Sequence, residues 1–227
     1  MKTSVQAVIF DLDGTLLNTI HDIATSVNNP LAKLGIPSYS DEEFKYFVGD
    51  GVHTLVKRVL ARYPHHHHQE SWLVDAYMSE YAIHQFDTTT PYEGIHPLLE
   101  ELASHSIRIA VLSNKPHQDT LKVIKHYFPF LPQQDVWGKK PEFPPKPNPQ
   151  SLLALLHYLQ LSKENVWYVG DTATDMMTAK NGGLTAIGVT WGFHQKEELI
   201  DAHADFIVSH PHEIWRLLEE HNKHASE

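Results

Sequence analysis

The sequence predicts an α/β fold, a doubly wound parallel sheet with an all-helical domain inserted after its first strand. In the C-terminal half, short apolar runs rich in Val and Ile alternate with amphipathic stretches, as strands and crossover helices do. The first apolar run, 5–10, lies far from the second, 107–112, although a parallel crossover needs only about 30 residues. The additional residues between these two runs, roughly 17–87, show a helical pattern throughout. We therefore expect a core formed by 1–16 and 88–227, and a helical cap domain formed by 17–87.

The composition excludes several classes of partner and site. The 227 residues hold 28 acidic and 18 basic side chains, a formal net charge of −10, and no basic stripe, so nucleic acid is not an expected partner. The absence of cysteine excludes disulfides and thiolate metal sites and fits a reducing compartment. No signal-peptide pattern and no membrane-spanning apolar run is found. We expect a cytoplasmic protein, monomer or homodimer, with no membrane partner.

The inserted segment shows helical spacing and clear breaks. The run Ser40-Asp41-Glu42-Glu43 is a capping box, and Gly49 and Gly51 interrupt the helical pattern that follows it. The expected elements, in chain order, are a helix from Leu16 to Leu34 that Pro30 kinks or divides, a helix from about Asp41, a tight loop at 48–51, a helix over 52–63, a helix over 71–86 and a linker over 87–94.

Four consecutive histidines, His65 to His68, allow two interpretations. Such a tract can bind metal weakly. It follows Tyr63-Pro64 and precedes polar residues, a setting that favours a solvated loop between helices.

The rest of the chain alternates strongly between apolar runs and amphipathic stretches. Gly182-Gly183 is expected to end one helix, and Pro149 to begin another. The expected elements are a helix over 95–103, a strand over 107–113, a helix over 117–127, a Pro- and Lys-rich loop over 138–149, a helix from 149, a strand over 165–170, a helix over 174–180, strands over 184–189 and 205–208, and a helix over 213–221.

Polar side chains follow three of the predicted strands at the point where each strand ends. Asp11 and Asp13 end the first strand, Ser113 and Asn114 the second, and Asp171 a third, with Asp175 one helical turn later. Open α/β sheets bind ligands at the carboxyl ends of their strands. Each group has an ordinary alternative as a surface turn or a helix cap. The repetition of the pattern favours a shared site.

Carboxylates gathered at one point repel one another and require a cation. Oxygen ligands without cysteine point to Mg²⁺, which leaves room for a substrate phosphate. Lys146 supplies further positive charge, although it has the alternative of a solvated loop lysine. One of the two leading aspartates can attack phosphorus, and the other can give a proton to the leaving oxygen. The Ser113 hydroxyl and the Asn114 backbone N–H can donate to the phosphoryl oxygens.

These segments resemble the four motifs of the haloacid dehalogenase-like hydrolase superfamily: Asp11-Leu12-Asp13-Gly14-Thr15, Ser113-Asn114-Lys115, Lys146-Pro147-Asn148-Pro149 and Gly170-Asp171-Thr172-Ala173-Thr174-Asp175. The resemblance implies a Rossmann-like core with a C1 cap. It implies Asp11 as nucleophile and Asp13 as general acid and then base. It also implies Mg²⁺ on Asp11, Asp171 and the Asp13 backbone carbonyl, Asp175 supporting the metal, and phosphate contacts from Ser113, Asn114 and Lys146.

Within that superfamily, the segment Lys45-Tyr46-Phe47-Val48-Gly49-Asp50-Gly51 is similar to the cap segment of phosphoglycolate phosphatases, which commonly carry Arg where Lys45 stands. This similarity implies a specificity loop containing Lys45, Gly49, Asp50 and Gly51. We expect an Mg²⁺-dependent phosphatase of a small phosphorylated metabolite, with 2-phosphoglycolate as the leading candidate. The alternatives are a phosphosugar mutase of the β-phosphoglucomutase type and a non-catalytic phospho-receiver or regulator.

Overall fold

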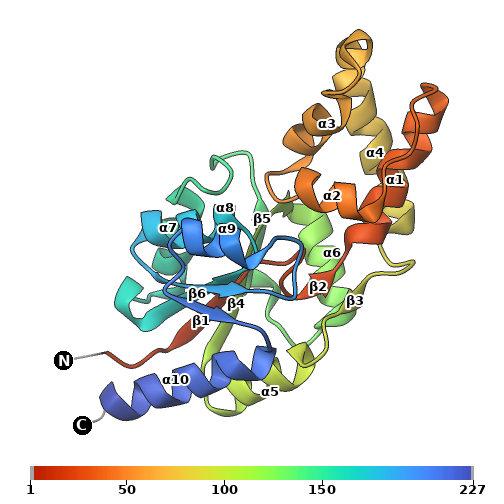
Figure 1. The fold of residues 1–227 in the computed structure, drawn as a ribbon. Coiled ribbons are helices and arrows are strands. Elements are labelled where there is room, and N and C mark those ends of the chain that lie inside the picture. Colours follow the sequence, from red (N-terminus) through yellow and green to blue (C-terminus); the bar gives the residue numbers. More distant parts are fainter. Residues whose placement is uncertain (1–2, 226–227) are drawn as a thin grey trace.

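Six strands form the central sheet within residues 3–225, the part of the chain that the computed structural model describes (Figure 1). All adjacent strands in this sheet run parallel. From β1 the chain adds strands first on one side and then on the other, which confirms the predicted doubly wound topology. The spatial order is β5 (Val136–Lys139), β4 (Arg108–Pro116), β1 (Ala7–Phe10), β6 (Val166–Gly170), β7 (Thr185–Val189) and β8 (Phe206–Val208).

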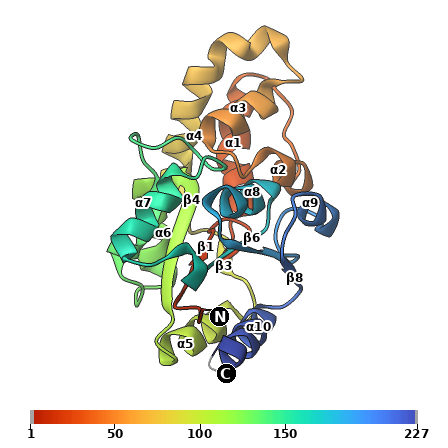
Figure 2. The same cartoon turned by 90° about the vertical axis from the view of Figure 1, so that its left-hand side faces the viewer.

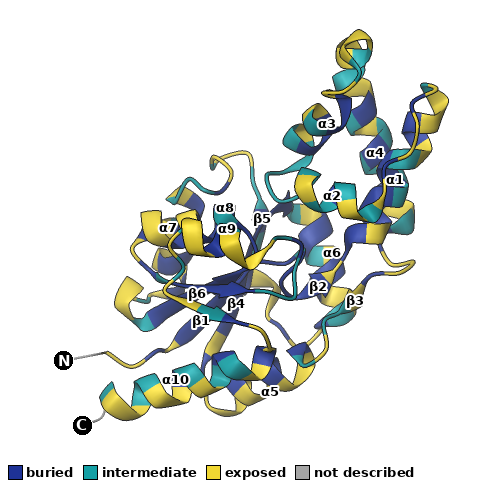
Figure 3. Ribbon diagram, in the orientation of Figure 1, coloured by how far each residue is buried: buried dark blue, intermediate teal, exposed yellow. Residues whose placement is uncertain are grey.

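Helices cover both faces of this sheet (Figure 2). Alternate residues of β1 face opposite layers: Val8 and Phe10 pack with one set of helices, and Ala7 and Ile9 with the other. Because both faces are covered, the inner strands β1 and β6 are buried along their whole length (Figure 3). One layer holds α5 (Ile95–Ser104), α6 (His117–Tyr127) and α10 (Pro211–Ala225), and the other holds α7 (Gln150–Leu159), α8 (Ala173–Gly182) and α9 (Lys196–Asp201).

Two core elements lie outside the sequence-based prediction. The segment from Gly138 onward was expected to be a loop, but β5 includes Gly138 and Lys139 and pairs with β4 at the edge of the sheet. An edge strand of four residues, one of them a glycine, carries little of the apolar signal by which strands are recognised. Helix α9 has only six residues, too few to show a helical period. Short 3₁₀ helices also precede β5 and β6, at Gln133–Asp135 and Lys163–Asn165.

The helices between β1 and α5 pack around a hydrophobic core of their own above one end of the sheet (Figures 1 and 2). We call this group the cap. The predicted capping box is present: the Glu43 N–H donates to Oγ of Ser40, and the Ser40 N–H donates to Oε2 of Glu43. The cap helices are α1 (Ile20–Lys33), α2 (Asp41–Phe47), α3 (Val52–Leu60) and α4 (Glu70–His84).

The start of the first cap helix differs from the prediction. Leu17–Asn18 form a short strand, β2, which pairs antiparallel with β3 (Thr90–Pro91), and α1 begins only at Ile20. The apolar spacing from Leu16 onward predicts a helix, but Leu17 and Asn18 instead pair with the segment that leads from the cap back to the core. Asp22 strengthens this junction, since its carboxylate accepts hydrogen bonds from the backbone and hydroxyl groups of Thr88 and Thr89.

The structure corrects two details expected for the cap, the division of its first helix at Pro30 and the loop at the histidine tract. Pro30 does not divide α1, which continues to Lys33; the lost backbone donor falls near the helix end, and Pro30 is buried. The histidine tract forms a 3₁₀ helix, Pro64–Gln69, instead of a loop. His66 and His67 bond locally, to Gln69 and to the Leu60 carbonyl, while the tract stays largely exposed.

Candidate active site

Three buried carboxylates meet at the carboxyl ends of β1 and β6. One oxygen from each of Asp11, Asp171 and Asp175 lies within 4.8 Å of the others. Asp11 directly follows β1, Asp171 follows β6, and Asp175 lies in the first turn of α8. The parallel sheet therefore brings together residues 160 positions apart in the chain, as expected for strand ends that share one edge. We call Asp11, Asp171 and Asp175 the carboxylate cluster.

The Asp171 side chain is held from two sides. Its Oδ1 accepts a hydrogen bond from Oγ1 of Thr15 at 2.9 Å, and its Oδ2 accepts one from the Phe193 N–H at 2.8 Å. Glycine backbones lie directly against it: a Cβ on Gly14 would lie 2.2 Å from Oδ2, and one on Gly192 would lie 2.4 Å from it. These positions therefore need glycine for the carboxylate to keep its place.

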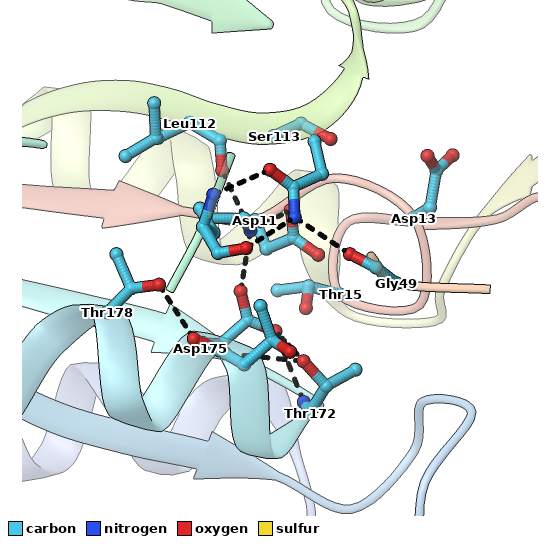
Figure 4. A network of polar contacts seen from close by, with 12 residues as sticks. Asp11, Asp13, Thr15, Gly49, Leu112, Ser113, Thr172, Asp175 and Thr178 are labelled. Carbon is cyan, nitrogen blue, oxygen red and sulfur yellow. Dashed lines mark hydrogen bonds and ion pairs between the residues drawn. The ribbon is translucent and has the colours of Figure 1, made fainter. Parts of the chain in front are cut away.

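Lys146 is the counter-charge of the cluster. Its Nζ donates to Asp11 at 2.7 Å and to Asp175 at 2.6 Å, and also to the Leu112 carbonyl and the Tyr168 hydroxyl. Figure 4 shows three of these acceptor residues, Asp11, Asp175 and Leu112, close together. Burial alone would lower the pKa of Lys146, but Asp11 and Asp175 outweigh it and raise this pKa well above its usual value. Lys146 therefore stays charged.

One lysine does not balance three carboxylates. With all four groups ionised, the charges −3 and +1 leave a formal charge of −2. Burial, and then the charge of Asp175, raise the pKa of Asp11 well above its usual value. The same two causes raise the pKa of Asp171 to about 7. The raised pKa values and the excess negative charge show that the ionised cluster needs more positive charge. Because its ligand atoms are all carboxylate oxygens, a hard divalent cation suits it.

Asp13 does not belong to the carboxylate cluster and is paired with a different lysine. Both oxygens of Asp13 accept hydrogen bonds from Nζ of Lys115, at 3.0 and 3.2 Å. Figure 4 shows the Asp13 carboxylate pointing away from Asp175. No role was expected for Lys115 from the sequence, although it directly follows Ser113 and Asn114. The side chain is only 4 % exposed, and its Nζ lies 4.4 Å from the Tyr81 ring centroid.

Ser113 and Asn114 are buried residues near the carboxyl end of β4, and both line the same cavity as Asp11. The Asn114 side chain is occupied within the protein: its Nδ2 donates to the carbonyls of Gly49 and Lys146, and its Oδ1 accepts from the Lys146 N–H. It thus fastens the cap loop and the Lys146 loop to the sheet. The Ser113 hydroxyl accepts a hydrogen bond from the Lys115 N–H at 3.2 Å and lines the cavity described next.

A cavity of about 50 Å³ lies between the carboxyl ends of the strands and the cap. Since a water molecule needs about 10–15 Å³ of such space, the cavity accepts a group of a few non-hydrogen atoms. The core contributes charged and polar residues, and the cap contributes mainly apolar ones. Its lining is Asp11, Asp13, Ser113, Asn114, Lys115 and Pro116 from the core, and Ile23, Val48, Gly49, Gly51, Val52, Leu55 and Tyr77 from the cap.

The four residues of the predicted specificity loop have different positions. Gly49 and Gly51 line the cavity, with φ angles of +114° and +87°. Asp50 turns away and accepts a hydrogen bond from Thr174 of α8 at 2.6 Å, and it also pairs with Arg58. Lys45 lies on α2, paired with Glu42 at 2.6 Å, and is not among the residues that line the cavity.

Gly14→Ala is expected to disrupt the site and destabilise the fold. The residue has a φ of +89°, and its new methyl group would overlap the Asp171 carboxylate. Gly35→Ala is a matched control, because Gly35 has a φ of +68° with no atom within 4 Å of the added Cβ. We expect the control to show only the backbone strain, about 1–2 kcal/mol, and Gly14→Ala a clearly larger loss in urea unfolding. Equal losses would contradict the proposed packing of Gly14 against Asp171.

Comparison with known proteins gives the family. A family model described as haloacid dehalogenase-like hydrolase matches residues 8–189. The phosphoglycolate phosphatase of Vibrio cholerae is 30% identical, over 95% of this chain and 96% of that protein. That of Aquifex aeolicus is 29% identical, over 96% and 98%.

A solved structure gives the same result. A Lactobacillus delbrueckii protein assigned as a phosphoglycolate phosphatase superposes with a TM-score of 0.89 at 26% identity, covering 95% of this chain and 99% of that one. No helix in the described part of the chain has the length and apolar character to cross a membrane. The carboxylate cluster lies in the region matched by the family model. The chain belongs to the haloacid dehalogenase-like hydrolase family.

Proposed function

We propose that this protein is an Mg²⁺-dependent phosphatase that hydrolyses a small phosphorylated metabolite, 2-phosphoglycolate, through a phosphorylated Asp11. The observation that carries the proposal is the arrangement around Asp11. Asp11 accepts a hydrogen bond from a buried lysine, lies close to two further carboxylates and lines a small cavity. Two relatives that match nearly the whole chain, those of Aquifex aeolicus and Vibrio cholerae, are phosphoglycolate phosphatases, which supports the choice of substrate.

In the first step, an Asp11 oxygen attacks the phosphorus of the monoester, and the bond from phosphorus to the ester oxygen breaks. Asp13, in its protonated form, gives its proton to that leaving oxygen, so the alcohol departs neutral at this atom. The Ser113 hydroxyl and the Asn114 backbone N–H donate to the phosphoryl oxygens. Lys146 fixes the Asp11 carboxylate by its 2.7 Å hydrogen bond.

In the second step, Asp13, now a carboxylate, removes a proton from water. The resulting hydroxide attacks the phosphorus of the aspartyl-phosphate, and the bond from phosphorus to Asp11 breaks. Phosphate leaves, Asp11 is again a carboxylate, and Asp13 again carries a proton. Asp13 is suited to both tasks because it lines the same cavity as Asp11.

Asp11, Asp171 and the backbone carbonyl of Asp13 are the proposed ligands of the magnesium ion, with Asp175 supporting them. When bound, the ion supplies positive charge to the transferring phosphoryl group. The excess of negative charge in the carboxylate cluster supports this assignment.

Magnesium is expected to stabilise the protein more at pH 8 than at pH 5. Burial raises the pKa of Asp171 to about 7, so at pH 5 its carboxyl group holds a proton that the metal must displace. Thermal unfolding with magnesium or with a chelator, at both pH values, measures this. A magnesium-induced shift that is larger at pH 5 would contradict the proposed ligands.

The function is tested with a panel of phosphate esters, including 2-phosphoglycolate and sugar phosphates, with and without magnesium. We expect free phosphate as the product, the highest kcat/KM for 2-phosphoglycolate, and no turnover with excess chelator. An isomerised sugar phosphate would indicate the mutase instead. No released phosphate from any ester would support the non-catalytic receiver.

A further inference from the structure

We propose that Lys115 selects the substrate by binding an anionic group on the leaving alcohol, a carboxylate next to the carbon that carries the phosphate. The inference rests on the proposed phosphatase function and names the residue that gives it specificity. Lys115 is at the end of β4, two residues after Ser113, and its side chain lines the cavity while only 4 % of it is exposed.

Lys115 is the cation best placed for this purpose. Among the described residues that line the cavity, Lys115 alone is positively charged. Lys146 is 3 % exposed and engaged by Asp11 and Asp175. On the cap, Lys45 pairs with Glu42 outside the cavity, and Arg58 is held by Asp50 and the Phe47 carbonyl.

Lys115 is positioned to bind the far end of a short leaving group. Its Nζ lies 3.0 and 3.2 Å from the two Asp13 oxygens. Asp13 is the proposed proton donor to the ester oxygen, so Lys115 is close to whatever that oxygen carries. An ammonium group has three N–H donors and can serve Asp13 and one further acceptor together. A carboxylate attached one carbon from the ester oxygen is within its reach.

The surroundings of Lys115 are mostly apolar, which strengthens its interaction with a bound anion. The cap side is formed by apolar groups, among them Ile23, Val52 and Leu55, with Tyr77 beside them. The Tyr81 ring lies on Lys115 at 4.4 Å, and the Tyr81 hydroxyl has no hydrogen-bond partner within the described residues. An anion that enters such a place unpaired pays a large desolvation cost, whereas a paired one gains a strong, charge-assisted hydrogen bond. Neutral leaving groups gain nothing comparable.

The test compares two substrates that differ in one group, 2-phosphoglycolate and 2-hydroxyethyl phosphate, in which a hydroxymethyl group replaces the carboxylate. Lys115→Met removes the charge but keeps most of the length. Because Lys115 also holds Asp13, the variant slows both substrates, and the ratio of their kcat/KM values isolates specificity. We expect this ratio to fall about 10-fold or more, mainly through KM for 2-phosphoglycolate. Lys115→Arg keeps the charge and should retain most of the preference.

Two comparisons make the result decisive. Lys122→Met, at an exposed lysine of α6, should leave the ratio unchanged. Lys45→Met tests the competing cation on the cap, and a larger fall in the ratio there than at Lys115 would overturn the inference. A wild-type preference for 2-phosphoglycolate that Lys115→Met fully retains would overturn the role of Lys115 alone. A wild type without any such preference would overturn the proposed substrate as well.

Discussion

Asp11→Asn is expected to lower kcat by about four orders of magnitude or more, because an amide oxygen cannot form the phosphorylated intermediate and the acting groups work as one unit. The substitution changes no volume and removes one of three clustered negative charges. Since burial and Asp175 already raise the pKa of Asp11, the neutral side chain should not lower the free energy of unfolding. Initial rates with 2-phosphoglycolate and urea unfolding measure the two effects.

Asp75→Asn provides the control for this experiment. Asp75 is an exposed residue of α4, so the same change of charge there should leave both the rate and the stability near the wild-type values. If a folded Asp11→Asn protein kept a kcat within about 10-fold of the wild type, instead of losing about four orders of magnitude, Asp11 would not be the nucleophile.

Lys146→Met is expected to cost about 3–5 kcal/mol of stability in the presence of a chelator, because it leaves buried carboxylates without their counter-charge. Lys146 is 3 % exposed and pairs with Asp11 and Asp175, both nearly inaccessible. Magnesium should restore part of the loss, since it supplies charge to the same carboxylates. Urea unfolding of the variant with chelator and with magnesium gives both quantities.

For comparison, Lys125→Met at an exposed position of α6 should change the free energy of unfolding by no more than about 0.5 kcal/mol. If the loss for Lys146→Met were as small as this, the carboxylate cluster would not depend on Lys146 for its charge balance.

The sequence predicts the core well because strand ends are a strong local signal. Asp11 and Asp171 each follow a short apolar run, and a doubly wound sheet has only one edge where such residues can meet. Capping signals were equally informative, as at Ser40 and Glu43. In these places, local preference and tertiary packing favour the same structure.

The sequence predicts less where a contact joins distant segments without a local signal. The pairing of β2 with β3 joins the two linkers, and no periodicity at Leu17 indicates it. The edge strand β5 carries a glycine and a lysine, so it reads as a loop. The ion pair of Lys115 with Asp13 spans 102 positions, and the cavity brings both residues together with the cap. Such contacts follow only from the assembled fold.

The cap loop illustrates the same limit in the candidate site. Resemblance suggested one group of four residues, but the fold gives them different surroundings. Gly49 and Gly51 line the cavity, Asp50 bonds to Thr174 of the core, and Lys45 pairs with Glu42 on its own helix. Which of them faces the substrate depends on how the cap packs on the core.

The stereochemistry at phosphorus tests the central claim most directly. A substrate made chiral at phosphorus with oxygen isotopes is hydrolysed in isotopically labelled water, and the configuration of the released phosphate is determined. Attack by Asp11 followed by attack of water gives two in-line displacements, so we expect net retention of configuration at phosphorus. Net inversion would mean that water attacks the substrate directly, and Asp11 would then not be the nucleophile.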